Sequence, residues 1–346
     1  MSVIPGHFKV VGVLPSVIES KHPENALIAS IIQRNSFFLN SKFLFLPNVW
    51  NPSIIKWSNM TIISWRLKGE LKFASVNENL FSARVSAEDI LIGPELDGIP
   101  FDGNKHEDPR LFTLTNGKLL VTFTSVTPPR GKKRIPHAMQ SYSLGTYNAP
   151  SGVTFEKALL FDQDFGGWQK NWVPFEYDAS LYFIQQIFPP RIFRVIGKFP
   201  TNQTVQFQEI PILDPPRSLP WFEEFGVIRG GTPAIYVRSR NLFLMVFHSV
   251  YRFRDYYMGA MTLCPRPPFS IHSISPVPIV DLQFYSGPRM SRKVPYVVFP
   301  TSLALSEGET DVILAFGHQD KNGVLARFPL SDLLGSLTTV QPCPAG

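Results

Sequence analysis

Five proline-containing segments recur along the chain at similar intervals, each ahead of an apolar run rich in β-branched and aromatic residues. Their prolines are separated by 57, 65, 59 and 67 residues. A single proline at the start of a strand is tolerated, because the hydrogen-bond donor that it lacks is not needed there. Five at similar spacing indicate instead a repeated structural unit built from strands. The segments are Asn51-Pro52-Ser53, Asp108-Pro109-Arg110, Val173-Pro174-Phe175, Thr232-Pro233-Ala234 and Phe299-Pro300-Thr301.

Each segment is followed by a turn and then by a run that has the length and composition of a strand. Every run ends in a polar or small residue, as expected where a strand leaves the packed interior for solvent. The five runs are Met60 to Arg66, Lys118 to Ser125, Ser180 to Gln186, Asn241 to His248 and Asp311 to His318.

These features predict an all-β chain folded as a single five-bladed β-propeller. We expect residues 46–340 to form the propeller and residues 1–45 to be a short N-terminal lead-in. The lead-in is expected to hold one helix at Glu24–Gln33 and a strand that closes the ring, and a further short helical turn is expected at Leu330–Leu334. The alternatives are a β-sandwich or two smaller β domains. A propeller would bring equivalent residues of every blade to one central funnel, so that distant segments form one site.

The composition favours a large, well-buried core. Of the 346 residues 44% are hydrophobic and 17% are charged, which argues against disorder. No stretch reaches the roughly 18 apolar residues that would span a bilayer, and no secretory signal is evident, so we expect a cytoplasmic protein. The two cysteines, Cys264 and Cys343, do not make a disulfide framework, and a chain of this size needs no disulfide.

The charge pattern and the motifs limit the classes of function. The net charge is +6, with a basic cluster at Arg130–Arg134 that is either a solvated loop or a rim attracting an anionic substrate. No recognisable motif or long basic stripe predicts a nucleic-acid partner. No nucleophile elbow, phosphate-binding loop or dinucleotide fingerprint is present, so no cofactor is predicted. The histidines are too scattered to predict a metal site; those considered are His106, His137, His248 and His318.

Three of the proline-containing segments carry residues suited to chemistry. Asn104–Arg110 is the densest polar cluster, and an acid beside arginine there could be a tuned proton donor or part of a buried ion pair. Lys170 and Trp172 could hold an anion and a sugar face, or could be a surface lysine and a core tryptophan. The paired glycines of Arg229–Pro233 permit close backbone approach to a ligand or to a neighbouring strand. His248, alone at a strand end, is either structural or functional.

Taken together, the motifs resemble family 130 of the glycoside hydrolases, the β-mannoside phosphorylases and their relatives, which are five-bladed propellers. The resemblance covers roughly residues 45–335 and follows the order of the predicted blades. The residues that carry it are Asn51-Pro52 with Arg66, Glu107-Asp108-Pro109-Arg110, Lys170-Asn171, Gly230–Pro233 with Phe247–Ser249 and Tyr256–Ala260, and Val297–Pro300 with Phe316–Asp320.

The resemblance implies a role for each matching position. The aspartate of the family's Glu-Asp-Pro-Arg motif is the proton donor, often through a hydroxyl of the sugar, and this role maps to Asp108. An anion attacks the anomeric carbon from the opposite face, so that configuration inverts and only one protein carboxylate is required. The implied phosphate- or anion-binding residues are Arg66, Lys170, His248 and Tyr256, and the implied substrate-binding residues are Asn51, Arg110, Asn171 and Asp320.

The expected function is therefore inverting glycosyl transfer on β-mannosides or similar glycans. The expected partners are a sugar or glycan acceptor and either phosphate, for a phosphorylase, or an activated sugar donor, for a mannosyltransferase. The family's further arginine between blades two and three has no equivalent in Ser141–Lys157, which keeps the transferase function open. The sequence is also compatible with a hydrolase on the same scaffold and with a propeller that binds glycan or protein without turnover.

Overall fold

The structure is a computed structural model, and it describes part of the chain. The described residues are 42–46, 48–57, 60–76, 92–96, 105–127, 137–148, 152–155, 159–160, 169–196, 206–212, 215–216, 218–219, 221–251, 255–280, 284 and 296–344. The expected helix at Glu24–Gln33 and the basic cluster at Arg130–Arg134 lie outside these residues, as does most of the expected lead-in.

Three antiparallel sheets follow one another through the first two thirds of the chain. The first has the order β2 (Trp50–Trp57), β3 (Met60–Leu67), β4 (Glu70–Val76) and β5 (Ile92–Leu96). The second has the order β6 (Lys105–Thr113), β7 (Leu119–Thr127), β8 (His137–Asn148) and β10 (Leu159–Leu160), with β9 (Gly152–Phe155) also paired to β8. The third has the order β11 (Val173–Tyr177), β12 (Ser180–Gln186), β13 (Arg191–Ile196) and β14 (Gln206–Ile210).

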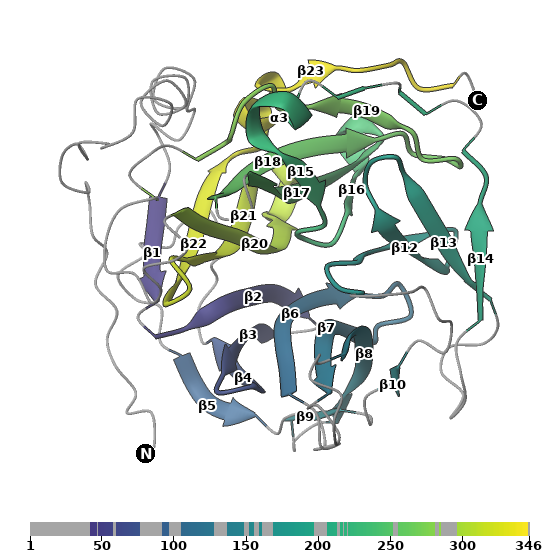
Figure 1. The fold of residues 1–346 in the computed structure, drawn as a ribbon. Helices are drawn as coiled ribbons and strands as arrows, with labels where there is room; N and C mark the ends of the chain where they lie inside the picture. Colours follow the sequence, from purple (N-terminus) through teal and green to yellow (C-terminus); the bar gives the residue numbers. More distant parts are fainter. Residues whose placement is uncertain are drawn as a thin grey trace, which may run out of the picture.

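The last sheet has ten strands and contains two antiparallel groups. The three sheets above are the first three strand groups. The fourth strand group holds β15 (Val227–Arg229), β16 (Ile235–Val237), β17 (Leu242–Tyr251), β18 (Asp255–Leu263), β19 (Ile271–Ile274) and β23 (Thr338–Thr339). The fifth strand group has the order β20 (Tyr296–Leu305), β21 (Asp311–His318), β22 (Asn322–Pro329) and β1 (Lys42–Leu46). A short parallel pairing between β18 and β20 joins them, and β1 pairs antiparallel with β22. Figure 1 shows these strand groups arranged around a common centre.

Helices are short among the described residues. They are α2 (Trp221–Phe225), α3 (Leu330–Gly335) and two 3₁₀ turns at Arg238–Arg240 and Glu307–Glu309. The expected helical turn near Leu330–Leu334 is therefore confirmed. None of the helices in this part of the chain is long and apolar enough to cross a lipid bilayer.

Apolar clusters join each strand group to the next in chain order, and the last group to the first. Trp57 and Phe123 lie in a cluster shared by the first and second groups, and a further cluster centred on Trp172 joins the second and third. The largest cluster links the third group to both halves of the ten-stranded sheet. A fourth cluster contains Ile54 of β2 and Ile313 of β21, so the fifth group packs against the first. Burying these sheet faces against one another is the main source of stability for such an architecture.

The repeated prolines occupy three kinds of backbone site. The strand register shifts at or beside the prolines of β2, β6 and β20, which is the mark of a β-bulge. In β2 and β6 the proline is itself unpaired and needs no donor, whereas in β20 Pro300 lies opposite Phe316 and the next residue is skipped. Pro174 lies in the regular ladder of β11, the edge strand of its sheet, opposite Phe183. Pro233 lies between β15 and β16, where the edge of the sheet is interrupted. The repeat that appears uniform in sequence is therefore structurally uneven.

The two cysteines pair with each other, although the size of the chain had indicated no need for a disulfide. Cys264 follows β18, Cys343 follows β23, and the two form a disulfide with a Cα–Cα distance of 5.4 Å across a sequence separation of 79 residues. The pairing of β23 with β19 brings the C-terminal segment back to β18, a contact that residue spacing alone does not reveal. Stable disulfides are typical of oxidising compartments, and the cytoplasmic location stays a prediction.

Candidate active site

Asp108 lies on the β-bulge of β6, where the backbone is left-handed. Its φ is 56°, and only 7% of its surface is exposed. Aspartate and asparagine adopt this conformation more readily than most residues, which explains why an Asx residue precedes the bulge proline. A bulge re-aims a side chain out of the regular alternation of a strand. The bulge therefore takes the Asp108 side chain out of the alternation by which the other side chains of β6 point to one face of the sheet or the other.

Asn51 occupies the matching bulge of β2 and holds the Asp108 carboxylate. Its φ is 47°, and its Nδ2 donates a hydrogen bond to Asp108 Oδ1 over 2.6 Å. The Oδ1 atom of Asn51 lies against Gly317 of β21, so closely that a Cβ at this glycine would overlap it. The orientation of the Asn51 amide is thus fixed from two sides. Because the acid is bonded through one oxygen, its second oxygen remains for other partners.

Arg110 is fully buried and bonded to three protein acceptors. Its Nη1 donates to the backbone carbonyl of Asp108 over 3.1 Å, its Nη2 donates to Asn171 Oδ1 over 2.9 Å, and its Nε donates to the Gly231 carbonyl. Burial lowers the Arg110 pKa to about 10, opposed by the charge of Asp108, so the guanidinium stays protonated at neutral pH. A side chain so enclosed joins the second, third and fourth strand groups, and this geometry favours a positioning role over the predicted sugar contact.

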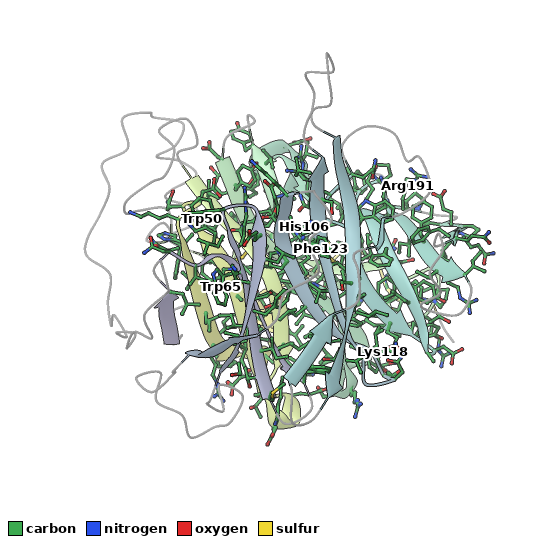
Figure 2. All side chains as sticks on the ribbon, turned by 90° about the horizontal axis from the view of Figure 1, so that it is seen from below. Trp50, Trp65, His106, Lys118, Phe123 and Arg191 are labelled. Carbon is green, nitrogen blue, oxygen red and sulfur yellow. A yellow bond between two sulfur atoms is a disulfide. The ribbon has the colours of Figure 1, made fainter. Side chains whose placement is uncertain are left out.

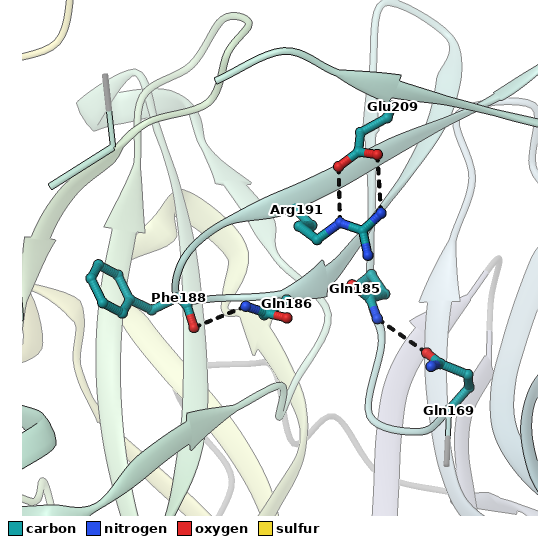
Figure 3. Close-up of polar contacts among 6 residues, drawn as sticks. All are labelled: Gln169, Gln185, Gln186, Phe188, Arg191 and Glu209. Carbon is teal, nitrogen blue, oxygen red and sulfur yellow. Dashed lines mark hydrogen bonds and ion pairs between the residues drawn. The ribbon is translucent and has the colours of Figure 1, made fainter. Parts of the chain in front are cut away.

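The segment that carries Lys170 and Asn171 is braced by its neighbours. Asn171 is left-handed at φ 66°, and its carbonyl lies where a Cβ on Gly230 would be. The Gln169 side-chain oxygen accepts hydrogen bonds from Trp172 Nε1 and from Gln185 Nε2, each over 3.1 Å. Figure 3 shows the Gln169–Gln185 bond beside the paired Arg191 and Glu209. Lys170, half-buried, therefore projects from a segment whose flanking residues are held in place.

The cation Arg66 is paired with an acid that the sequence analysis did not single out. Arg66 Nη2 lies 2.7 Å from Glu107 Oε1, and about a quarter of each side chain is exposed, at 27% and 23%. The guanidinium also lies over the Trp50 ring, at 5.7 Å from its centroid. Burial, then the charge of Asp108, raises the Glu107 pKa, whereas Arg66 lowers it. Glu107 could have been suspected, because it precedes Asp108 in the polar cluster.

Asp320 comes from the other side of the site. It follows β21 in a left-handed turn, with φ 49°. Asp320 is exposed at the surface, yet desolvation by the protein around its carboxyl raises its pKa; the charge of Asp108 raises the pKa further, and Arg66 and Lys170 lower it. Asp320 is therefore within electrostatic reach of residues from three other strand groups. The structure brings Glu107, Asp108 and Asp320 together with two cations.

His248 and Tyr256 form a stacked pair at the fourth strand group. Their ring centroids are 5.6 Å apart at an interplanar angle of 10°, and Phe299 covers the histidine at 4.7 Å. Burial and then the charge of Arg110 hold the His248 pKa well below its usual range, with Arg229 adding to this, so the imidazole is neutral. Burial raises the Tyr256 pKa, and the phenol therefore keeps its proton.

Arg229 is a further residue that the sequence analysis passed over as a functional candidate. It is exposed at the end of β15, opposite His248 in the strand register, and its charge acts on both His248 and Tyr256. Its position immediately before the glycine pair was a signal that could have identified it. It adds a cation on the side of the site where the fourth strand group lies.

All nine residues predicted from the sequence lie in the described part of the chain, and hydrogen bonds, ring contacts or charge interactions link them. They gather at one end of the strand groups. In Figure 2, Trp50 and His106, which flank Asn51 and Glu107 in sequence, lie toward one end of the molecule, and Lys118 at the far end of the β6–β7 hairpin lies toward the other. The arrangement sets the buried Asp108 carboxylate close to cations that are chemically able to stabilise an anion.

The chain matches no family model, and no curated protein matches it. Solved structures do match it. A putative glycosidase from Bacteroides thetaiotaomicron is 12% identical with a TM-score of 0.54, covering 82% of this chain and 87% of that one. The β-1,2-mannobiose phosphorylase from Listeria innocua is 12% identical with a TM-score of 0.53, covering 85% and 92%. An α-L-arabinofuranosidase from Lactobacillus brevis is 14% identical with a TM-score of 0.53, covering 87% and 95%.

These likenesses concern the fold. The all-β chain has a fold of the β-propeller type that such glycosidases and phosphorylases adopt. At this level of identity a shared fold does not carry a shared activity, which must be argued from the site.

Proposed function

We propose that this protein is a carbohydrate-active enzyme that transfers a hexosyl group with inversion, on β-mannosides or similar glycans. The observation that carries the proposal is the bulge-borne Asp108 carboxylate, held through one oxygen by Asn51 beside cations from other strand groups. An acid fixed in this way has one oxygen available for a reacting sugar. A protein that only binds glycan has no need of such an acid.

The proposal includes the architecture of a five-bladed propeller. The five antiparallel groups would be the blades, within residues 46–340, and β1 would complete the fifth blade from the lead-in at residues 1–45. Support comes from the pairing of β1 with β22 and from the apolar clusters that join neighbouring groups, including the fifth with the first. Such a ring directs the bulges of β2, β6 and β20 to one centre.

In the proposed reaction Asp108 moves one proton. In the direction of cleavage it donates the proton to the glycosidic oxygen, directly or through a sugar hydroxyl, while the bond from that oxygen to the anomeric carbon breaks. An anionic oxygen forms the new bond to the anomeric carbon from the opposite face. In the direction of synthesis Asp108 accepts the proton of the acceptor hydroxyl as the anion departs. No second protein carboxylate is needed to activate a water.

The anion requires fixed positive charge and neutral donors. We assign the charge to Arg66 and Lys170, with Arg229 as a further cation, and a neutral hydrogen bond to the Tyr256 hydroxyl. His248, neutral and enclosed between Tyr256 and Phe299, orients the tyrosine in this scheme.

Sugar hydroxyls are assigned to the polar residues that remain. Asn171, from the third strand group, and Asp320, from the fifth, are the candidates, and Asn51 holds the acid. Arg110 is assigned to positioning, since its three bonds fasten Asp108 and Asn171.

The experiment that tests the proposal compares two activated donors. The purified chain is incubated with mannose acceptors and either mannose 1-phosphate or GDP-mannose, and the products are separated by chromatography. Product with the first donor alone identifies a phosphorylase, and product with the second alone identifies a transferase. Absence of product with both, together with retained sugar binding, would overturn enzymatic transfer.

A hydrolase on the same scaffold is the second candidate. It is favoured by one observation, namely that Glu107 and Asp320 both have raised pKa values near Asp108, so a second carboxyl group is at hand. Hydrolysis would release free sugar from a β-mannoside in phosphate-free buffer, and transfer would not. The anomeric configuration of the first product, read by NMR, separates inverting from retaining chemistry.

A further inference from the structure

The C-terminal segment is fastened to the strands β18 and β19 by covalent and backbone bonds. Cys343 forms the disulfide with Cys264 at the end of β18. The short strand β23 pairs with β19, and the Val340 amide donates to the His272 carbonyl over 2.8 Å. The two sulfur atoms are therefore held near each other by backbone pairing as well as by their own bond.

A histidine lies beside the two sulfur atoms. A ring nitrogen of His272 and the sulfurs of Cys264 and Cys343 all lie within 4.8 Å of one another. His272 Nδ1 is 3.0 Å from the Gln341 carbonyl oxygen. A carbonyl only accepts, so this bond places the ring proton on Nδ1 and leaves the lone pair on Nε2. Metal-binding histidines almost always donate their other ring N–H to a carboxylate, a carbonyl or water in this way.

We propose that Cys264, His272 and Cys343 form a binding site for a thiophilic divalent cation, Zn²⁺ above all, when the disulfide is reduced. Two thiolates and one imidazole suit zinc, and a set of three protein ligands is completed by water in a tetrahedral site. Calcium and magnesium, which take oxygen ligands, do not fit this donor set.

The redox step is an ordinary thiol–disulfide exchange. A dithiol reductant supplies two electrons and two protons, which convert the bond between Cys264 and Cys343 into two thiols, and the dithiol itself becomes a disulfide. Binding of Zn²⁺ then displaces both thiol protons to solvent, since the thiolate is the ligand. The C-terminal segment is thus fastened by a disulfide in one state and by a metal ion in the other.

This site is remote from the candidate active site. Cys264 follows the C-terminal end of β18, whereas Tyr256 lies near its beginning, about 26 Å away at the rise of a strand. Substitutions at the cysteines and at His272 therefore leave the residues around Asp108 in place. The proposed role is to hold β23 against β19 in a reducing environment.

The test uses the full, untagged chain with Zn²⁺ as the probe. After chelator treatment, the chain reduced with a phosphine and the oxidised chain are titrated with Zn²⁺ against a chromophoric chelator. We expect the reduced chain to bind about one equivalent, the oxidised chain to bind none, and Zn²⁺ to raise the Tm of the reduced chain alone. In His272→Ala and Cys343→Ser the reduced chain should bind at least about tenfold more weakly.

Gln341→Ala is the matched control, because its backbone carbonyl remains and its side chain is not a ligand. It should bind Zn²⁺ like the unaltered chain, and circular dichroism checks that every variant is folded. Three outcomes would each overturn the proposal. In the first, the reduced chain fails to bind one equivalent of Zn²⁺; in the second, the oxidised chain binds Zn²⁺ as well as the reduced chain does. In the third, both His272→Ala and Cys343→Ser bind it like the unaltered chain.

Discussion

The side-chain amide of Asn51 donates a 2.6 Å hydrogen bond to the carboxylate of Asp108, and both residues have left-handed backbones at β-bulges of neighbouring strand groups. The bond crosses from β2 to β6, so the acid is oriented by a strand group other than its own. The position of Asn51 depends in turn on Gly317 of β21. Three strand groups therefore determine where one carboxylate points.

Replacement of Asp108 by Asn is expected to remove activity and leave the fold intact. Asparagine is nearly isosteric and tolerates the same left-handed backbone, but it cannot donate or accept the proton in transfer. We expect turnover to fall by about 10²–10⁴-fold, measured with whichever donor the unaltered chain accepts. Asp178→Asn is the matched control, since Asp178 is also left-handed but lies in the exposed turn between β11 and β12. Unchanged turnover in Asp108→Asn would refute the mechanism.

Gly317→Ala should damage the site through Asn51. The added Cβ would overlap Asn51 Oδ1, so the amide must shift away from Gly317, and its hydrogen bond to Asp108 is disturbed. We expect at least about a tenfold loss of kcat, because small displacements of a catalytic group are costly, with a destabilisation of about 1–3 kcal/mol. Gly335→Ala, whose Cβ would meet nothing within 4 Å, should change neither quantity appreciably. Equal activity in the two alanine variants would mean that Asn51 does not depend on Gly317.

Arg110→Met is expected to be strongly destabilising. Methionine fills similar volume but leaves the acceptors on Asp108, Asn171 and Gly231 buried without their donor. We expect a loss of about 3–5 kcal/mol in the free energy of unfolding, measured by urea denaturation. Arg194→Met is the control, since Arg194 is exposed on β13, and it should cost less than about 1 kcal/mol. If both variants unfolded at similar urea concentrations, Arg110 would not have the positioning role assigned to it.

Stability should fall as the pH drops from 6.5 toward 4, partly through His318. Burial lowers the His318 pKa from 6.5 to about 4 in the folded chain, so over this range the unfolded chain binds a proton that the folded chain does not. The free energy of unfolding then decreases with falling pH, by up to about 3 kcal/mol for this group. Comparison with His318→Gln isolates the effect, which should be absent in the variant.

The raised pKa values of Glu107 and Asp320 act in the opposite sense, since protonation of these acids favours the folded chain as the pH falls. Both acids are present in the unaltered chain and in His318→Gln, so their contribution cancels when the stabilities of the two chains are compared. Parallel stability curves for the unaltered chain and His318→Gln between pH 4 and 6.5 would show that His318 does not titrate as expected.

Local chemistry accounts for what could be predicted from the sequence. The apolar runs and their turns form strands because alternation and turn residues act over a few positions, and the Asx-Pro pairs at Asn51 and Asp108 form bulges for the same reason. The all-β class and the nine predicted site residues followed from these short-range rules and from a resemblance. Their proximity could be expected only because a repeat places equivalent positions together.

Only the tertiary structure decided what each of these residues touches. Arg110 donates hydrogen bonds to acceptors in three strand groups, its own among them. Arg66 is paired with Glu107, and Asp320 lies within reach of Asp108 from more than 200 residues away in the chain. The disulfide depends likewise on β23 pairing with β19. Such contacts depend on how separate sheets pack and in which register, and these are properties of the assembled core that no local pattern encodes.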